Sequence, residues 1–333
     1  MIQKVVRTVA GDIDPEALGY CQCHEHLFLA RGISGEKVPS LILDDYSKTT
    51  QELKMYFTRG GRGVVDAQPV GCGRMASELR KASLESGVHV IASTGFHKLD
   101  FYDREHFIFN MDTEQLEQLF VEELTIGMFT DKVNGIEAPT VRGEAKAGII
   151  KAASDGRDIR MNTGSLPVYK KLFTAAGKAA KRTGSPVITH LEMGKGADSQ
   201  LEVLTAQGIL PQRIVMSHLD RVIQSSNSDY QLNVARSGVY MQLDTIGRFK
   251  YHSDEEEAEF ILMLCEKGYE DKILLGLDTT SERMKSYGGA IGLDYILDIF
   301  RLLLHKYGIG DDLFHRFTVE NPKNAIYFER KTE

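Results

Sequence analysis

Short apolar runs rich in valine, isoleucine and leucine recur along the chain, and each is followed by a polar loop and then by a stretch with helical spacing. Eight of these runs are predicted to be β-strands, at residues 18–27, 63–70, 89–96, 147–153, 186–193, 213–220, 239–244 and 272–278. Stretches between them predict helices at 73–87, 166–184, 252–268 and 293–308, each ending in a glycine. Near the C-terminus, Asn321 is predicted to cap a last helix that opens with Pro322.

Strands that alternate with helices in this way predict an α/β fold, a (β/α)8 TIM barrel. A doubly wound open sheet is the alternative. No glycine-rich linker or low-complexity segment divides the sequence, so residues 1–333 are expected to form a single domain. Residues 1–17 precede the first predicted strand, and we expect them to form a hairpin over the bottom of the barrel.

Composition narrows the class of protein. The sequence has 333 residues, of which 42% are hydrophobic and 26% charged, and this is typical of a globular protein. The formal net charge of -7 and the lack of a basic run argue against nucleic acid or an anionic membrane as the main partner. The N-terminus lacks the apolar stretch of a signal peptide, so a cytoplasmic protein is expected. The four cysteines are too few for a disulfide scaffold and are interpreted as thiols.

Polar residues stand at the C-terminal ends of the predicted strands, where (β/α)8 barrels carry their chemistry. They are His24 and His26 after the first strand, Lys151 in the fourth, His190 in the fifth, His218 in the sixth and Asp278 in the eighth. A His-x-His pair alone fits a packed or surface pair equally well. Together, these side chains provide enough ligands for two divalent ions, which are typically about 3.5–4 Å apart in such hydrolases.

Side chains alternate between the faces of a strand, so His24 and His26 should share one face. If they point into the barrel, Cys21 and Cys23 should point toward the helices and act as small buried apolar groups. Lys151 lies among apolar residues, where an ammonium group would have to lose its charge, find a partner or extend toward solvent.

Seven segments resemble, in order, the phosphotriesterase-like family of the amidohydrolase superfamily: CHEHL, VVDAQPVGCGRMASELRKAS, VHVIASTGF, AGIIKAA, PVITH, SHLD and LLGLD. The resemblance covers nearly the whole chain. It implies a (β/α)8 barrel with a binuclear centre of zinc or similar divalent ions. It also implies the two sets of ligands: His24, His26 and Asp278 for the more buried ion, and His190 and His218 for the more exposed one.

Lys151 matches the lysine that carbon dioxide carboxylates in this family, and the carboxylated lysine bridges both ions. The resemblance therefore accounts for a lysine in an apolar strand. It further implies that a metal-bridging hydroxide attacks the substrate, and that Asp278 takes its proton and returns it to the leaving group. Lys151 and Asp278 are accordingly the expected catalytic residues.

The loops after the seventh and eighth strands point to an anionic substrate. They read DTIGRFKYHSDEE and DTTSERMKSYGG, and they carry Arg248, Lys250 and Tyr251, followed by Arg283, Lys285 and Tyr287. Cations beside aromatic hydroxyls suit a phosphate group, although each could also merely solvate its loop. Lys250 and Arg283 are the preferred contacts, and Tyr287 is next. The predicted substrate is a lactone of a phosphorylated sugar, as for the phospho-furanose lactonases of this family.

The segment GFHKLDFYDREHFIFNMD, from Gly95, is rich in aromatic residues and could be a lid, a substrate wall or a dimer surface. The family tends to form homodimers, so we expect a dimer surface with His97 or Lys98 near the pocket. Cys72 is expected either to line the pocket or to be a buried structural thiol.

Two other functions remain open at this point. One is a carboxylesterase, phosphotriesterase or lactonase that acts on neutral substrates. The other is a metal-binding protein without catalysis, which Lys151 and Asp278 disfavour because both stand where catalysis would need them.

Overall fold

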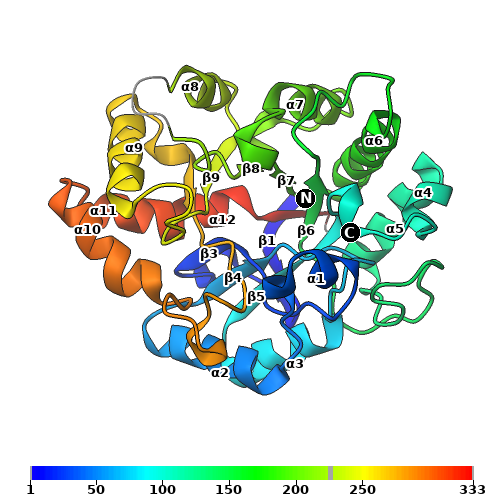
Figure 1. Ribbon diagram of the computed structural model, residues 1–333, viewed down its shortest axis with the longest axis horizontal. Helices are drawn as coiled ribbons and strands as arrows, with labels where there is room; N and C mark the ends of the chain where they lie inside the picture. Colours follow the sequence, from blue (N-terminus) through cyan, green and yellow to red (C-terminus); the bar gives the residue numbers. More distant parts are fainter. Residues whose placement is uncertain (1, 224–227, 332–333) are drawn as a thin grey trace.

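The computed structural model describes residues 2–223 and 228–331 and shows eight parallel strands ringed by helices (Figure 1). Neighbouring strands in the sheet are also consecutive in the sequence. The strands are β3 (Cys21–Glu25), β4 (Gly63–Asp66), β5 (His89–Phe96), β6 (Ile149–Ala153), β7 (Val187–His190), β8 (Ile214–Ser217), β9 (Tyr240–Leu243) and β10 (Ile273–Leu275). Each lies inside one of the eight predicted strands, and the (β/α)8 barrel is confirmed.

Hydrogen bonds from residues just after β10 to the last two residues of β3 bring the first and last strands of the barrel together. The Asp278 amide donates to the His24 carbonyl at 3.0 Å. The Glu25 carboxylate accepts from the Leu277 amide at 2.8 Å and from the Thr279 amide at 3.1 Å. Two residues of the predicted metal site, His24 and Asp278, are thus held side by side through their backbones.

Helices cover the outside of the barrel (Figure 1). They are α1 (Ile33–Lys37), α2 (Tyr46–Thr58), α3 (Ala76–Ser86), α4 (Phe107–Asn110), α5 (Thr113–Thr125), α6 (Leu166–Thr183), α7 (Ala197–Thr205), α8 (Asp229–Arg236), α9 (Asp254–Glu266), α10 (Arg301–Lys306), α11 (Asp311–His315) and α12 (Asn321–Ala325). The predicted helices correspond to α3, α6, α9 and to α10 with the π-helical turn Ile296–Phe300 before it. Gly87 and Gly184 end α3 and α6 in the left-handed conformation, with φ of 78° and 76°.

The predicted role of Asn321 is wrong. A π-helical turn, Arg316–Glu320, runs directly into α12, so Glu320 is already helical and no new cap is needed. The Asn321 amide instead donates to the carbonyls of Glu270 and Ile273, both at 2.8 Å. It therefore ties α12 to the start of β10.

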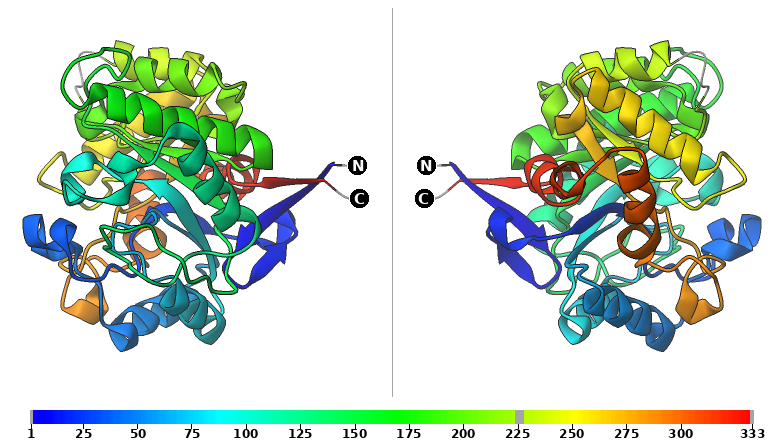
Figure 2. Two further views of the ribbon diagram at one scale, coloured as in Figure 1. Left: turned by 90° about the vertical axis from the view of Figure 1, so that its right-hand side faces the viewer. Right: turned by 90° about the vertical axis from the view of Figure 1, so that its left-hand side faces the viewer.

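A three-stranded sheet covers the bottom of the barrel. β1 (Ile2–Thr8) pairs antiparallel with both β2 (Gly11–Ile13) and β11 (Phe328–Lys331). Val6 of β1 belongs to one buried cluster with apolar side chains from all eight barrel strands: Cys21, Cys23, Val65, Ile91, Ile149, Ile188, Val215, Tyr240 and Leu274. Figure 2 shows the two termini side by side at this end, far from α1.

The expected orientation of Cys21 and Cys23 is wrong, because both side chains belong to this interior cluster. The register against β4 shifts between Gln22 and Glu25, so β3 contains an irregularity of the β-bulge type. An extra residue in a strand resets the alternation of faces. For this reason Cys23 packs inside the barrel although the next residue, His24, reaches the site above it. Both cysteines are buried among apolar groups, as expected.

Among the residues that the structure describes, no helix combines the length and apolar character required to cross a membrane.

Candidate active site at the mouth of the barrel

A cavity of about 390 Å³ opens at the C-terminal ends of the strands. This volume is in the range of small-molecule binding sites. Ten of the predicted site residues line it: His24, His26, His97, Lys98, His190, His218, Arg248, Lys250, Asp278 and Arg283. The structure thus brings together side chains from both halves of the chain.

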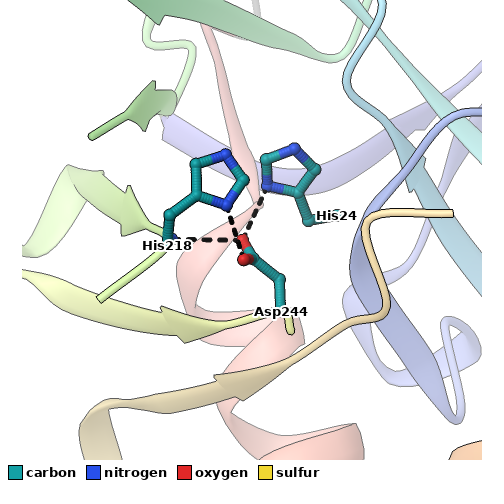
Figure 3. A group of neighbouring side chains, drawn as sticks. All are labelled: His24, His218 and Asp244. Atoms are coloured by element: carbon teal, nitrogen blue, oxygen red, sulfur yellow. Dashed lines mark hydrogen bonds and ion pairs between the residues drawn. The ribbon is translucent and has the colours of Figure 1, made fainter. Parts of the chain in front are cut away.

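Asp244, directly after β9, holds two of the histidines (Figure 3). Its carboxylate lies 2.6 Å from Nδ1 of His218 and 2.9 Å from Nδ1 of His24. The contact with His218 is a hydrogen bond, which favours the tautomer with the proton on Nδ1 and leaves Nε2 as the ligand atom. The contact with His24 is close but lacks hydrogen-bond geometry. Burial lowers the pKa of both imidazoles, so both are neutral at neutral pH.

His190 and His218 face each other through atoms suited to a shared ion. Nε2 of His190 lies 3.1 Å from the Glu192 carboxylate, which can accept its proton and leaves Nδ1 with a lone pair. That Nδ1 is 2.8 Å from Nε2 of His218, which also carries a lone pair when Asp244 accepts the Nδ1 proton. Two acceptors this close are unfavourable without a cation or a proton between them, so the pair fits a bound metal ion.

His24, His26 and Asp278 form a second group. Oδ1 of Asp278 is 3.4 Å from Nε2 of His26 and 3.8 Å from Nε2 of His24. Among the described residues, Nδ1 of His26 has no hydrogen-bond partner although it is buried. Two imidazoles and a carboxylate are ordinary zinc ligands, so this donor set also fits a divalent ion.

Lys151 lies in the wall of the same site. Its side chain is fully buried, and Nζ is 3.3 Å from Nε2 of His24. Burial lowers the pKa of the lysine to about 8, although nearby Asp278 and Asp244 oppose the shift. The side chain therefore points into the barrel and does not extend toward solvent.

Two arginines hold Asp278. Oδ2 lies 2.9 Å from the guanidinium of Arg221 and 3.0 Å from that of Arg248. Burial raises the pKa of Asp278, but the charge of Arg248 and the contact with His26 outweigh burial and hold the pKa well below its usual range. Asp278 is thus a carboxylate at neutral pH.

The backbone is strained at two of these positions. His218 and Asp278 have φ of 65° and 48°, in the left-handed region that side chains other than glycine rarely adopt. Both residues follow the last residues of their strands, where the chain turns into a loop. Such conformations cost about 1–3 kcal/mol each and are concentrated at functional sites.

Arg283 is the most buried cation of the loop after β10, with 7% of its surface exposed. One guanidinium nitrogen donates to the Ile246 carbonyl at 2.6 Å. The other two, Nε and Nη1, are buried and find no hydrogen-bond partner in the described parts of the chain. Lys250, in the loop after β9, is exposed at the rim of the cavity.

Three residues predicted to contact the substrate do not line the cavity. The Lys285 ammonium binds Asp294 at 2.5 Å. The Tyr287 hydroxyl lies 2.8 Å from that of Thr49, and it ties its loop to the start of α2. Cys72 is 1% exposed and belongs to the apolar core. These predictions are corrected, since Lys285 and Tyr287 bind other parts of the chain and Cys72 is the buried thiol of the two alternatives.

The segment after β5 forms a wall of the cavity. His97, Lys98 and Phe101 line it, and the Lys98 ammonium binds Glu192 at 2.5 Å. Phe107, like most apolar side chains of the segment, is buried in the core of the chain itself. These buried side chains cannot form the dimer surface that was expected there.

Sequence reasoning missed Asp244, Arg221 and Glu192. Asp244 ends the seventh predicted strand, so the rule that selected His190 and Asp278 could have found it. Arg221 and Glu192 follow site histidines by three and two residues, in loops whose conformation no periodic pattern indicates.

Comparisons with known proteins agree with this geometry. The model of the phosphotriesterase family matches residues 4–326. The chain is 32% identical to a phospho-furanose lactonase of Mycoplasmopsis synoviae (strain 53), over 99% of this chain and 94% of that protein. A crystal structure of an amidohydrolase from Mycoplasma synoviae has a TM-score of 0.89 at 31% identity and covers 99% of this chain and 94% of that one.

The phosphotriesterase homology protein of Escherichia coli, solved with phosphate in its active site, has a TM-score of 0.79 at 29% identity. That match covers 93% of this chain and 99% of the other. The resemblance drawn from the sequence motifs is confirmed. The chain belongs to the phosphotriesterase family and is a metal-dependent hydrolase.

Proposed function

We propose that the protein hydrolyses the ester bond of a 1,4-lactone whose five-carbon sugar carries a 5-phosphate. The observation that carries this proposal is Arg283, a buried cation in the cavity wall with two nitrogens that lack a partner among the described residues. A buried guanidinium is stable when it is paired, and its fork of donors matches a phosphate group. Lys250, at the rim, would add a second positive charge.

The relatives support an anionic substrate. The Mycoplasmopsis synoviae protein is described as a phospho-furanose lactonase. The Escherichia coli structure holds phosphate in its active site. Of the cavity cations, Arg221 and Arg248 are paired with Asp278 and Lys98 is paired with Glu192, which leaves Arg283 and Lys250 for the phosphate.

At the other end of the substrate, His24, His26 and Asp278 would hold one divalent ion, and His190 and His218 a second. We propose zinc, since imidazole and carboxylate ligands suit it. Two such ions, when bound, would polarise the ester carbonyl and make water nucleophilic at neutral pH. Lys151 would bridge them as a carboxylated lysine, because burial lowers its pKa to about 8 and so increases the uncharged amine that reacts with carbon dioxide.

Asp278 would move the proton. Arg221 and Arg248 keep it ionised, so it can accept the proton of the attacking water. The same two cations make it a weak base, which favours onward transfer of that proton to the ring oxygen as the ester bond breaks. Lys98 and Glu192 would fix the side of the cavity next to His190.

The proposal is tested by a pH-release assay on the zinc-loaded protein with a panel of five-carbon 1,4-lactones, each offered with and without its 5-phosphate. We expect hydrolysis of at least one phosphorylated lactone, with a much lower kcat/KM for the same lactone without phosphate. If no phosphorylated lactone is opened while neutral aryl esters turn over well, the proposal is wrong and the esterase alternative holds. Apolar lining from Leu41, Phe101 and Phe249 is the feature that would favour such neutral substrates.

A homodimer in the cytoplasm is proposed from the family resemblance alone. Light scattering on the purified protein would show the mass of a single chain if the dimer is wrong.

A further inference from the structure

A second polar cluster lies buried outside the wall of the cavity. It consists of Asp220, two residues after His218, together with His252 and Glu257 at the start of α9. Asp220 and Glu257 are 0% exposed and His252 is 7% exposed. Each offers one ligand atom, and these atoms lie within 4.8 Å of one another.

This cluster has more hydrogen-bond acceptors than donors. Nδ1 of His252 is 3.0 Å from the Ser253 carbonyl, which can only accept, so that nitrogen carries the proton. Nε2 then has a lone pair; it lies 2.8 Å from the Thr245 hydroxyl, which can donate to it, and 3.1 Å from Oε2 of Glu257. Within the described residues, both oxygens of Glu257 and Oδ1 of Asp220 have no hydrogen-bond donor. Three carboxylate oxygens, two of Glu257 and one of Asp220, are therefore buried in this cluster without a donor.

The charged groups around Glu257 are also unfavourable for a buried carboxylate. Asp220, Asp254 and Asp244 act on it, and all of them are acidic. Burial raises the pKa of Glu257. Arg221 follows Asp220 in the chain, but its guanidinium binds Asp278. Buried carboxylates of this kind are found paired, protonated or bound to metal.

We infer that Asp220, His252 and Glu257 bind a divalent cation, separate from the two ions of the active site. One imidazole and two carboxylates suit zinc or manganese. Ligands about 2.1 Å from a tetrahedral zinc ion stand roughly 3.4 Å apart, close to the contact between His252 and Glu257. The cation would give the three unpaired oxygens a partner, and the bond from Nδ1 to Ser253 would orient His252 toward it. The Thr245 hydroxyl, which now lies 2.8 Å from Nε2, would donate to Asp220 instead.

The position of this ion gives it a structural role beside the catalytic centre. Oδ2 of Asp220 accepts from the Thr245 amide at 2.6 Å. Thr245 is next to Asp244, the carboxylate that contacts His24 and His218. The ion would therefore fasten the ends of β8 and β9 to α9 and hold Asp244 in place.

The test is metal content, measured by plasma mass spectrometry after the wild-type chain has been stripped, reloaded with zinc and passed through a desalting column. Glu257→Gln keeps the shape of the side chain but removes its charge, and it should hold one zinc fewer per chain than the wild type. Glu255→Gln removes an exposed carboxylate from the same helical turn and should leave the zinc content unchanged. Equal zinc in the wild type and in Glu257→Gln would overturn the inference.

Anomalous diffraction from zinc-loaded wild-type crystals gives a second readout that does not depend on how the variants fold. A peak bounded by Asp220, His252 and Glu257 is expected. A water molecule there, or no density at all, would contradict the inference. Peaks among His24, His26, His190 and His218 are scored separately, so failure of the proposed catalytic centre and failure of this site are distinguishable.

Discussion

Replacing Arg283 by glutamine tests how the cavity selects its substrate. Arg283 is the only buried loop cation among the lining residues described above that has no acidic partner, and two of its nitrogens are free to bind an anion. Loss of two charge-assisted hydrogen bonds to phosphate, at about 1.5 kcal/mol each, removes about 3 kcal/mol of binding. Since 1.4 kcal/mol is a factor of ten, kcat/KM for a phosphorylated lactone should fall roughly 100-fold.

The assay is the pH-release rate of Arg283→Gln on a lactone with and without its phosphate. The rate on the unphosphorylated lactone should stay within about threefold of the wild type, because apart from the phosphate contacts the change removes only the hydrogen bond to the Ile246 carbonyl described above. Lys285→Ala is the matched control, since this cation is in the same loop but binds Asp294 outside the cavity. An equal fall on both lactones would refute the reasoning, because it would show that Arg283 supports the fold or the reacting groups.

Three further changes probe the metal centre and the barrel. Asp244→Asn should weaken zinc binding about 10–100-fold in a competition titration, because an amide has one acceptor oxygen for two imidazoles. Unchanged zinc affinity would show that Asp244 does not position the two histidines. Asp278→Asn should lower kcat about 10²–10⁴-fold at saturating zinc, because the proton acceptor is lost; a rate near that of the wild type would contradict the proposed role. Arg74→Met should lower the free energy of unfolding in urea by about 3–5 kcal/mol, because it leaves Glu123, a fully buried carboxylate bound at 2.5 Å, without its cation; a loss below about 1 kcal/mol would show that the pair is not essential.

The barrel could be predicted because the sequence pattern of each of its strands is local. Each strand is a short apolar run, and chain order alone fixes which strands are neighbours. The β-bulge in β3 has no such pattern, since it depends on how β3 meets β4. The prediction that His24 and His26 share one face still held, because both line the cavity. The predicted orientation of Cys21 and Cys23 was wrong, since it assumed a regular strand.

The site was predictable to the extent that its residues end strands. His24, Lys151, His190 and Asp278 were selected by position, and Asp244 was available by the same rule. Side chains on loops behaved differently. Arg283 and Tyr287 are four residues apart in one loop, yet one lines the cavity and the other binds Thr49 of α2. Which way a loop side chain points depends on tertiary contacts that spacing does not encode.

A crystal structure of the zinc-loaded protein grown with inorganic phosphate tests the central claim most directly. We expect two ions among the four histidines and Asp278, a carboxylated Lys151 between them, and phosphate bound by Arg283 and Lys250. An unmodified Lys151 would contradict the bridged centre. Two ions with phosphate bound away from Arg283 would contradict the proposed substrate and would direct the search to neutral lactones and esters.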